Sequence, residues 1–230
     1  MLVASLMMYD RPDAVQRAND ALWIALRDRL RARDLGAPDL LDRSDSHESY
    51  WLRSDLVFGQ TCGFPYVSEL KGRVRLVATP IFRYLGGEGA RRASFIVVRE
   101  DDPARSIADL AGRRAAINDW FSNSGMNLLR IAVAPYARNG RFFSDVILTG
   151  SHMKSIPAVR EGRADTAAID SITWGLHERH APDTLAGIRI LGETPMGPGL
   201  PYITRLATTD AEIAALRETL AEVIADPANA

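Results

Sequence analysis

Short apolar runs alternate along the chain with segments of helical periodicity, and this alternation limits the fold more than any other feature. Each run has about four to seven residues, is rich in Val, Ile, Leu or Phe, and is bounded by turn-forming residues, as buried strands are. The runs show little polar–apolar alternation, so we expect burial on both faces, as in a parallel sheet. Such alternation of strands and helices predicts an α/β fold. The predicted strands are 2–8, 56–59, 74–78, 94–99, 114–118, 145–148, 166–169 and 188–191.

Two long helices are predicted, over 13–33 and 210–224. The first has one apolar stripe at helical spacing and a charged opposite face. Asp10 is expected to cap its start and Gly36 to end it, and Asp210 is expected to cap the second. Shorter helices are predicted over 46–52, 106–110, 124–138, 151–161 and 172–178, with Pro135 and Pro157 expected to kink or interrupt two of them.

Two segments have the composition of crossings between lobes. One is the strand 94–102, which follows a glycine-rich turn, and the other is the Gly- and Pro-rich segment 192–201. The residues between them have their own strand–helix alternation and suffice for a compact lobe. We therefore expect a discontinuous lobe 1 (1–97 and 193–230), a lobe 2 (98–192), a two-segment hinge and a ligand cleft between the lobes.

Charge and composition exclude several classes of protein. Lys+Arg is 28 and Asp+Glu is 29 in 230 residues, giving a net charge of -1, whereas a nucleic-acid binder should be basic. No apolar run reaches the roughly 18 residues that span a bilayer. The apolar residues at the start lack a basic region, so we expect either a cytoplasmic protein or a periplasmic one whose export signal is missing from the sequence. A monomer is expected.

Polar residues follow five of the predicted strands, at the point where a helix begins. The carboxyl ends of strands in open α/β sheets are where ligands bind. We therefore expect these five junctions to face one cleft. They are Tyr9-Asp10, Gln60–Gly63, Asn118–Gly125, Thr149–His152 and Asp170-Ser171.

The stretch Ser122-Asn123-Ser124-Gly125 is the most informative of the five. A helix that starts there directs free backbone N–H groups outward, which suits an oxyanion. The alternative is that Ser122 or Ser124 only caps the helix. His152 follows a second hydroxyl-bearing helix start, and taken alone it could equally be a structural histidine. Asp170 could cap the next helix, hold a cation or orient His152.

Motifs that would indicate an enzyme or a metal site are missing from the sequence. The residues around Ser124 do not form Gly-x-Ser-x-Gly, and His177 and His180 are one residue too close for the two-histidine zinc helix. There is no P-loop. A triad of Ser124, His152 and Asp170 would lack the strained nucleophile turn. We expect no catalytic residue, no metal and no cofactor.

Four segments together resemble a known family: 106–114, 118–125, Thr149–His152 and 161–170. Their order and spacing are similar to those of the phosphate/phosphite/phosphonate-type periplasmic solute-binding proteins of ABC transporters, which have the type 2 periplasmic-binding fold. The chain departs from the family pattern at Trp120-Phe121, where polar residues are common. This aromatic pair could narrow the cleft or favour an apolar ligand moiety.

The resemblance implies roles for eight residues. Ser122, Asn123 and Ser124 would cradle the oxyanion, and His152 would be a further donor. Asp170 would line the cleft as a polar wall that can meet an amino group. The remaining three, Tyr9, Thr61 and Tyr66, would form the first-lobe side.

The leading hypothesis is a binding protein for a small phosphonate- or phosphate-like solute, with an ABC permease as its partner. The alternative is a cytoplasmic enzyme on the same fold, of the menaquinone or thiamine-precursor biosynthesis type. In that case His152 would be the first catalytic candidate. An effector-sensing domain of a regulator ranks below both, because no helix-turn-helix or basic segment is present.

Overall fold

The computed structural model describes residues 1–229 and divides the chain into two compact units. Unit 1 comprises Met1–Pro80 and Leu200–Ala230, and unit 2 comprises Ile81–Gly199. Unit 1 is therefore built from both ends of the chain, and unit 2 from one continuous segment. The predicted boundaries, 97/98 and 192/193, fall inside unit 2, because both strands at those positions pair within its sheet.

Unit 1 contains a four-stranded sheet in the order β1-β2-β12-β3. β1 and β2 are parallel, and β12 runs antiparallel to both of its neighbours. The strands are β1 (Val3–Ser5), β2 (Leu56–Gln60), β3 (Val74–Ala78) and β12 (Tyr202–Arg205). The first is shorter than the predicted strand 2–8, because Met7–Tyr9 forms a helical turn.

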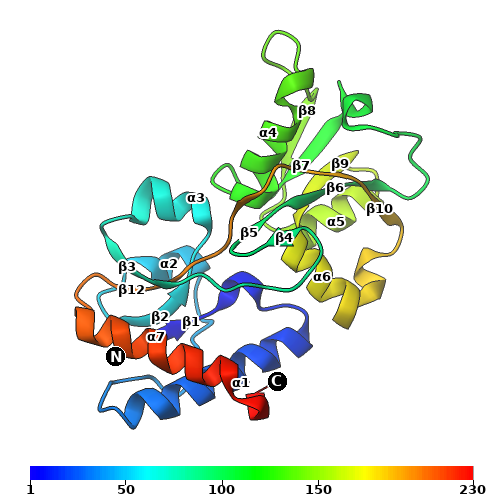
Figure 1. The fold of residues 1–230 in the computed structure, drawn as a ribbon. Coiled ribbons are helices and arrows are strands. Elements are labelled where there is room, and N and C mark those ends of the chain that lie inside the picture. The colour runs from blue at the N-terminus through cyan, green and yellow to red at the C-terminus, as the bar shows by residue number, and fades with distance from the viewer. Residues whose placement is uncertain (230) are drawn as a thin grey trace. The chain divides into compact units, whose positions relative to one another are not determined.

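Helices bury both faces of this sheet. On one face α1 (Asp13–Arg31) and α7 (Asp210–Ala225) lie side by side (Figure 1), with Trp23, Leu26 and Leu216 in one apolar cluster. On the other face Tyr50 and Trp51 pack with residues of β2 and β3. The other helical segments are η1 (Met7–Tyr9), α2 (His47–Trp51), α3 (Gly63–Pro65), η2 (Tyr66–Leu70) and η7 (Pro227–Asn229).

Two helix caps differ from those predicted. Thr209, not Asp210, caps α7, in a capping box with Glu212. Asp10 does not cap α1, because its carboxylate accepts hydrogen bonds from Arg43 at 2.6 and 3.0 Å and from Asn19 at 3.0 Å. The residue at the start of α1 is Pro12, and no side chain caps that helix.

Unit 2 contains a five-stranded mixed sheet in the order β10-β6-β9-β7-β8. β7, β8 and β9 are parallel, as predicted, whereas β6 and β10 are antiparallel to their neighbours. The strands are β6 (Ser94–Arg99), β7 (Arg114–Ile117), β8 (Asp145–Leu148), β9 (Thr166–Asp170) and β10 (Ile188–Glu193). A small second sheet pairs β4 (Gly87–Glu88), β5 (Arg91–Arg92) and β11 (Gly197–Pro198).

Successive residues of these strands enter different apolar cores, which explains their continuous apolar runs. Phe95 and Val97 pack with α5 (His152–Arg160) and α6 (Ser171–His180). Ile96 and Val98 pack with α4 (Leu128–Val133) on the opposite face. Pro157 lies within α5 and does not interrupt it. Shorter helical segments are η3 (Ile107–Leu110), η4 (Asn123–Asn127), η5 (Ala134–Tyr136) and η6 (Pro182–Leu185).

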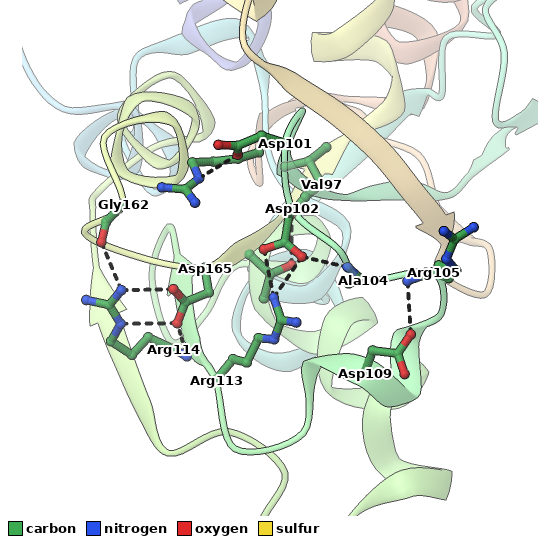
Figure 2. Close-up of polar contacts among 12 residues, drawn as sticks. Val97, Asp101, Asp102, Ala104, Arg105, Asp109, Arg113, Arg114, Gly162 and Asp165 are labelled. Carbon is green, nitrogen blue, oxygen red and sulfur yellow. Dashed lines mark hydrogen bonds and ion pairs between the residues drawn. The ribbon is translucent and has the colours of Figure 1, made fainter.

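Arginine–carboxylate pairs fix the amino end of β7 (Figure 2). Arg113 Nη1 lies 2.7 and 2.8 Å from the two carboxylate oxygens of Asp102. Arg114 donates to Asp165 and to the Gly162 carbonyl, each at 2.8 Å. These contacts hold the strand at the end opposite to its polar carboxyl-terminal turn. Among the described residues no helix is long and apolar enough to span a membrane.

Candidate functional site

The candidate site lies at the carboxyl ends of β7, β8 and β9 in unit 2. Because these strands are parallel, their polar carboxyl-terminal turns meet at one edge of the sheet. The turns after β7 and β8 are joined by a hydrogen bond from the Gly150 N–H to the Asn118 carbonyl, at 2.8 Å. Ser155 Oγ also donates to Asn118 Oδ1 at 3.3 Å. These bonds hold two helix starts next to each other.

Ser124 and His152 come together at these helix starts. Ser124 Oγ and His152 Nε2 lie 2.9 Å apart. The tautomer of the imidazole decides which of the two atoms donates. This contact joins two junctions that are 28 residues apart in the sequence, and both had been predicted to carry site residues.

Ser122 is the helix cap at this site, and Ser124 is not. Ser122 Oγ accepts a hydrogen bond from the Gly125 N–H at 3.0 Å, at the start of η4. This satisfies one of the orphan N–H groups of the first turn. The two alternatives for this stretch therefore apply to different serines: Ser122 caps the helix, and the hydroxyl of Ser124 is left for His152.

Gly125 allows the side chain of Asn118 to pack directly against the helix start. A Cβ atom at Gly125 would lie only 2.7 Å from Asn118 Cγ. The space in front of Gly125 is occupied by Asn118, which links the turns after β7 and β8.

Burial determines the protonation state of His152. Burial lowers the pKa of the imidazole to about 4, while the nearby Asp170 carboxylate raises it and the Arg92 guanidinium lowers it. At neutral pH the ring is therefore uncharged. A neutral imidazole offers a bound oxyanion one N–H donor rather than a positive charge.

Asp170 caps α6 and forms a buried ion pair with Arg92. Its Oδ1 accepts hydrogen bonds from the N–H groups of Ile172 and Thr173, at 2.9 and 3.2 Å, and its Oδ2 accepts from Arg92 Nε. Asp170 is 1% exposed and Arg92 3%. Although burial would raise the pKa of Asp170, the charge of Arg92 holds it below its usual value.

Arg92 is a residue of this site that was not predicted from the sequence. It lies 78 residues from Asp170, on β5, and its Nη1 also donates to the Pro198 carbonyl at 3.1 Å. No local motif marks this arginine among the others of the chain. The register that pairs Ser94 with Asp170 could have suggested it, because Arg92 is two residues before Ser94.

Several buried polar atoms near the two helix starts have no hydrogen-bond partner. They include Asn123 Nδ2 and Asn127 Nδ2. Buried polar groups in folded proteins are nearly always hydrogen-bonded, so such a cluster is characteristic of a functional site. These two atoms are amide donors, and a ligand rich in acceptor oxygens would satisfy them.

The arrangement does not form a catalytic triad. Asp170, the carboxylate that such a triad needs, is engaged by Arg92 and by the start of α6. Among residues 1–229 no group of three or more His, Cys, Asp or Glu side chains is arranged to hold a metal ion. The site offers hydrogen bonds to a ligand.

The other three predicted site residues belong to unit 1. Tyr9 is buried beside the sheet of that unit, and its carbonyl accepts a hydrogen bond from Asn19 Nδ2 at 2.6 Å. Thr61 is fully buried, and its N–H donates to the Pro201 carbonyl at 3.1 Å. Tyr66 is partly exposed at the start of η2.

A family model described as "ABC transporter, phosphonate, periplasmic substrate-binding protein" matches residues 54–230. A search of curated proteins finds no match.

Several solved structures have a similar fold. XAC2383 from Xanthomonas citri, bound to ATP, is 19% identical with a TM-score of 0.70, over 98% of this chain and 84% of its own. PhnD1 from Prochlorococcus marinus, in complex with methylphosphonate, is 16% identical with a TM-score of 0.72, over 97% and 83%. A binding protein of an ABC phosphonate transporter from Pseudomonas aeruginosa is 14% identical with a TM-score of 0.71, over 94% and 72%.

Proposed function

The chain belongs to the family of periplasmic substrate-binding proteins of ABC phosphonate transporters, and on that basis we propose that Ser122, Asn123, Ser124 and His152 bind the oxyanion of its ligand. The α/β fold is that of the type 2 periplasmic-binding proteins, as predicted. Members of the family are substrate-binding proteins, so the enzyme alternative is set aside.

The contact between Ser124 and His152 carries the proposal for the site. Their side-chain atoms are 2.9 Å apart where two helices start, and the first N–H groups of a helix have no partner within it. A phosphonate has three oxygens that accept hydrogen bonds and a negative charge that the helix start favours. Asn123 Nδ2, which is buried without a hydrogen-bond partner, lies among the same residues.

Neutral donors are sufficient for this ligand class. The site holds a neutral imidazole, hydroxyl groups and backbone N–H groups, and charge-assisted hydrogen bonds from such donors to an anion are stronger than neutral ones. Two of the similar structures are described as bound to ATP and to methylphosphonate, which both carry phosphorus oxyanions. These ligands define the panel for a first test.

The family also implies a cellular role. Its members are periplasmic components of ABC transporters. We therefore propose that this protein acts in the periplasm and delivers its ligand to a membrane permease, and we further propose that it does so as a monomer. Tyr9, Thr61 and Tyr66 remain predicted ligand contacts of unit 1. Of these three residues, Tyr66 is the best one to substitute first in a binding experiment, because it is the least buried.

The test is a double substitution, Ser124→Ala with His152→Ala. Wild-type protein should bind methylphosphonate or another oxyanion of a panel with phosphate, ATP and ethanesulfonate, measured by thermal shift and then by calorimetry. The double variant should bind at least about 100-fold more weakly, because each hydrogen bond to a charged group contributes about 1.5–3 kcal/mol.

The matched control is Ser49→Ala with His180→Ala, which removes the same two residue types at exposed positions. This control should keep wild-type affinity, and circular dichroism should show both variants folded. Unchanged affinity in a folded Ser124→Ala/His152→Ala variant would reject the site. Failure of the wild-type protein to bind any oxyanion of the panel would reject the function.

A further inference from the structure

Two large aromatic side chains are exposed on the turn just before the oxyanion site. Trp120 is 53% exposed and Phe121 57%, and Ser122 follows them directly. The turn is held by Asp119, whose Oδ1 accepts the Phe121 N–H at 2.8 Å and whose carbonyl accepts the Ser122 N–H at 3.1 Å. The two rings are therefore presented by a hydrogen-bonded turn, and adjacent exposed aromatic residues commonly mark a binding surface.

The carboxylate that could attract a ligand amine is already paired. Both oxygens of Asp170 accept hydrogen bonds, from Arg92 and from the start of α6, and the pair is almost fully buried. An ammonium group could reach Asp170 only by displacing Arg92, which would leave a buried guanidinium without its counterion. In the turn itself, Asp119 is exposed, and one of its oxygens holds the Phe121 N–H.

We propose that the ligand is an organic oxyanion whose substituent is uncharged and apolar, an aryl or bulky alkyl group that packs on Trp120 and Phe121. This inference rests on the proposed function, because it assumes that the oxyanion is held at Ser124 and His152. It adds the chemistry of the rest of the ligand. Aromatic rings bind such groups by apolar burial and by stacking.

Three phosphonates that differ only in their substituent test this inference: phenylphosphonate, methylphosphonate and 2-aminoethylphosphonate. By calorimetry, the wild-type protein should bind phenylphosphonate at least about 10-fold more tightly than the other two, since ring burial adds binding energy that a methyl group lacks. The Trp120→Ala/Phe121→Ala variant should lose about 10-fold in affinity for phenylphosphonate and less than about 2-fold for methylphosphonate. Both substitutions are at exposed positions, so the variant should stay folded.

The matched control is Ile131→Ala with Tyr136→Ala, two comparably exposed side chains of unit 2 outside this turn. It should bind all three phosphonates as the wild type does. An Asp119→Asn variant should also keep the wild-type preference for phenylphosphonate.

The outcomes separate the inference from the function on which it rests. If 2-aminoethylphosphonate binds as tightly as phenylphosphonate, the inference is wrong and the oxyanion site stands. The same holds if the aromatic variant loses affinity for methylphosphonate and phenylphosphonate equally. If the wild-type protein binds none of the three phosphonates, the inference is wrong, and if it also binds no other oxyanion of the first panel, the proposed function is wrong as well.

Discussion

His152 is both a proposed ligand-binding residue and a buried titratable group. Its side chain contacts Ser124, and burial holds its pKa at about 4, so the ring is neutral over the physiological range. The unfolded chain would protonate the same histidine near pH 6.5. Between these two values the unfolded state binds more protons than the folded state, and acidification therefore destabilises the fold.

We expect His152→Gln to weaken the acid sensitivity of folding. The wild-type free energy of unfolding should decrease as the pH falls from 7 toward 4, with a contribution from His152 of roughly 2–3 kcal/mol over the whole window. The variant should lack this contribution. Urea unfolding at pH 7, 6 and 5 measures the difference.

His180→Gln is the matched control, because it removes an exposed histidine. Burial also lowers the pKa of His177, so part of the acid sensitivity should persist in every variant. If the wild type and the His152→Gln variant lose the same free energy of unfolding between pH 7 and 5, His152 is not a source of the acid sensitivity.

At the scale of elements, β7 is fixed at both ends by different chemistry. Its amino end is held by ion pairs of Arg113 and Arg114 (Figure 2). Burial would raise the pKa of Asp102, but hydrogen bonds from Ala104 and Arg113 keep it below the usual value. At the carboxyl end Asn118 packs against Gly125, so the position of η4 depends on close contact rather than on charge.

Gly125→Ala should therefore destabilise unit 2 by about 1–3 kcal/mol, because the added methyl group overlaps Asn118. The displaced side chain would also lose its hydrogen bond with Ser155. Urea unfolding of Gly125→Ala, Asn118→Ala and the double variant measures the effect. In the Asn118→Ala background the glycine substitution should cost at least about 0.5 kcal/mol less, since the overlap is gone. Additive costs would show that the two residues do not compete for space.

At the scale of the molecule, each unit has its own apolar cores. Two clusters cover the two faces of the unit 2 sheet, and all their residues lie between Phe95 and Leu191. The clusters of unit 1 combine residues from both ends of the chain, such as Leu26 and Leu216. Unit 2 is thus continuous in sequence, whereas unit 1 needs both of its segments.

We expect a fragment of residues 81–199 to fold alone, and a fragment of residues 1–80 to remain unfolded without 200–230. A domain of this size with a complete core is able to fold independently. Circular dichroism and urea unfolding of both fragments test the prediction. A 81–199 fragment without a cooperative transition would contradict it.

Local sequence patterns determined the fold class of this protein and the position of most of its strands. Apolar runs located most of the strands, because burial on both faces requires apolar residues at every position. They did not locate β12 (Tyr202–Arg205), which lies between β2 and β3 in the unit 1 sheet. Parallel pairing of β7, β8 and β9 then follows from strand–helix alternation, and it places the strand-end polar residues at one edge. The serines and the histidine of the candidate site could therefore be predicted from the sequence. The family could also be predicted, from the order of its motifs.

Only the tertiary structure decided the contacts between distant segments. Nothing in the sequence pairs Arg92 with Asp170, because the ion pair depends on the antiparallel register of β6 and β9. Whether Ser122 or Ser124 caps η4 also depends on which hydroxyl His152 reaches. Periodicity reports how deeply a residue is buried. It does not report which partner a buried polar group meets, because that partner is fixed by the packing of the whole unit.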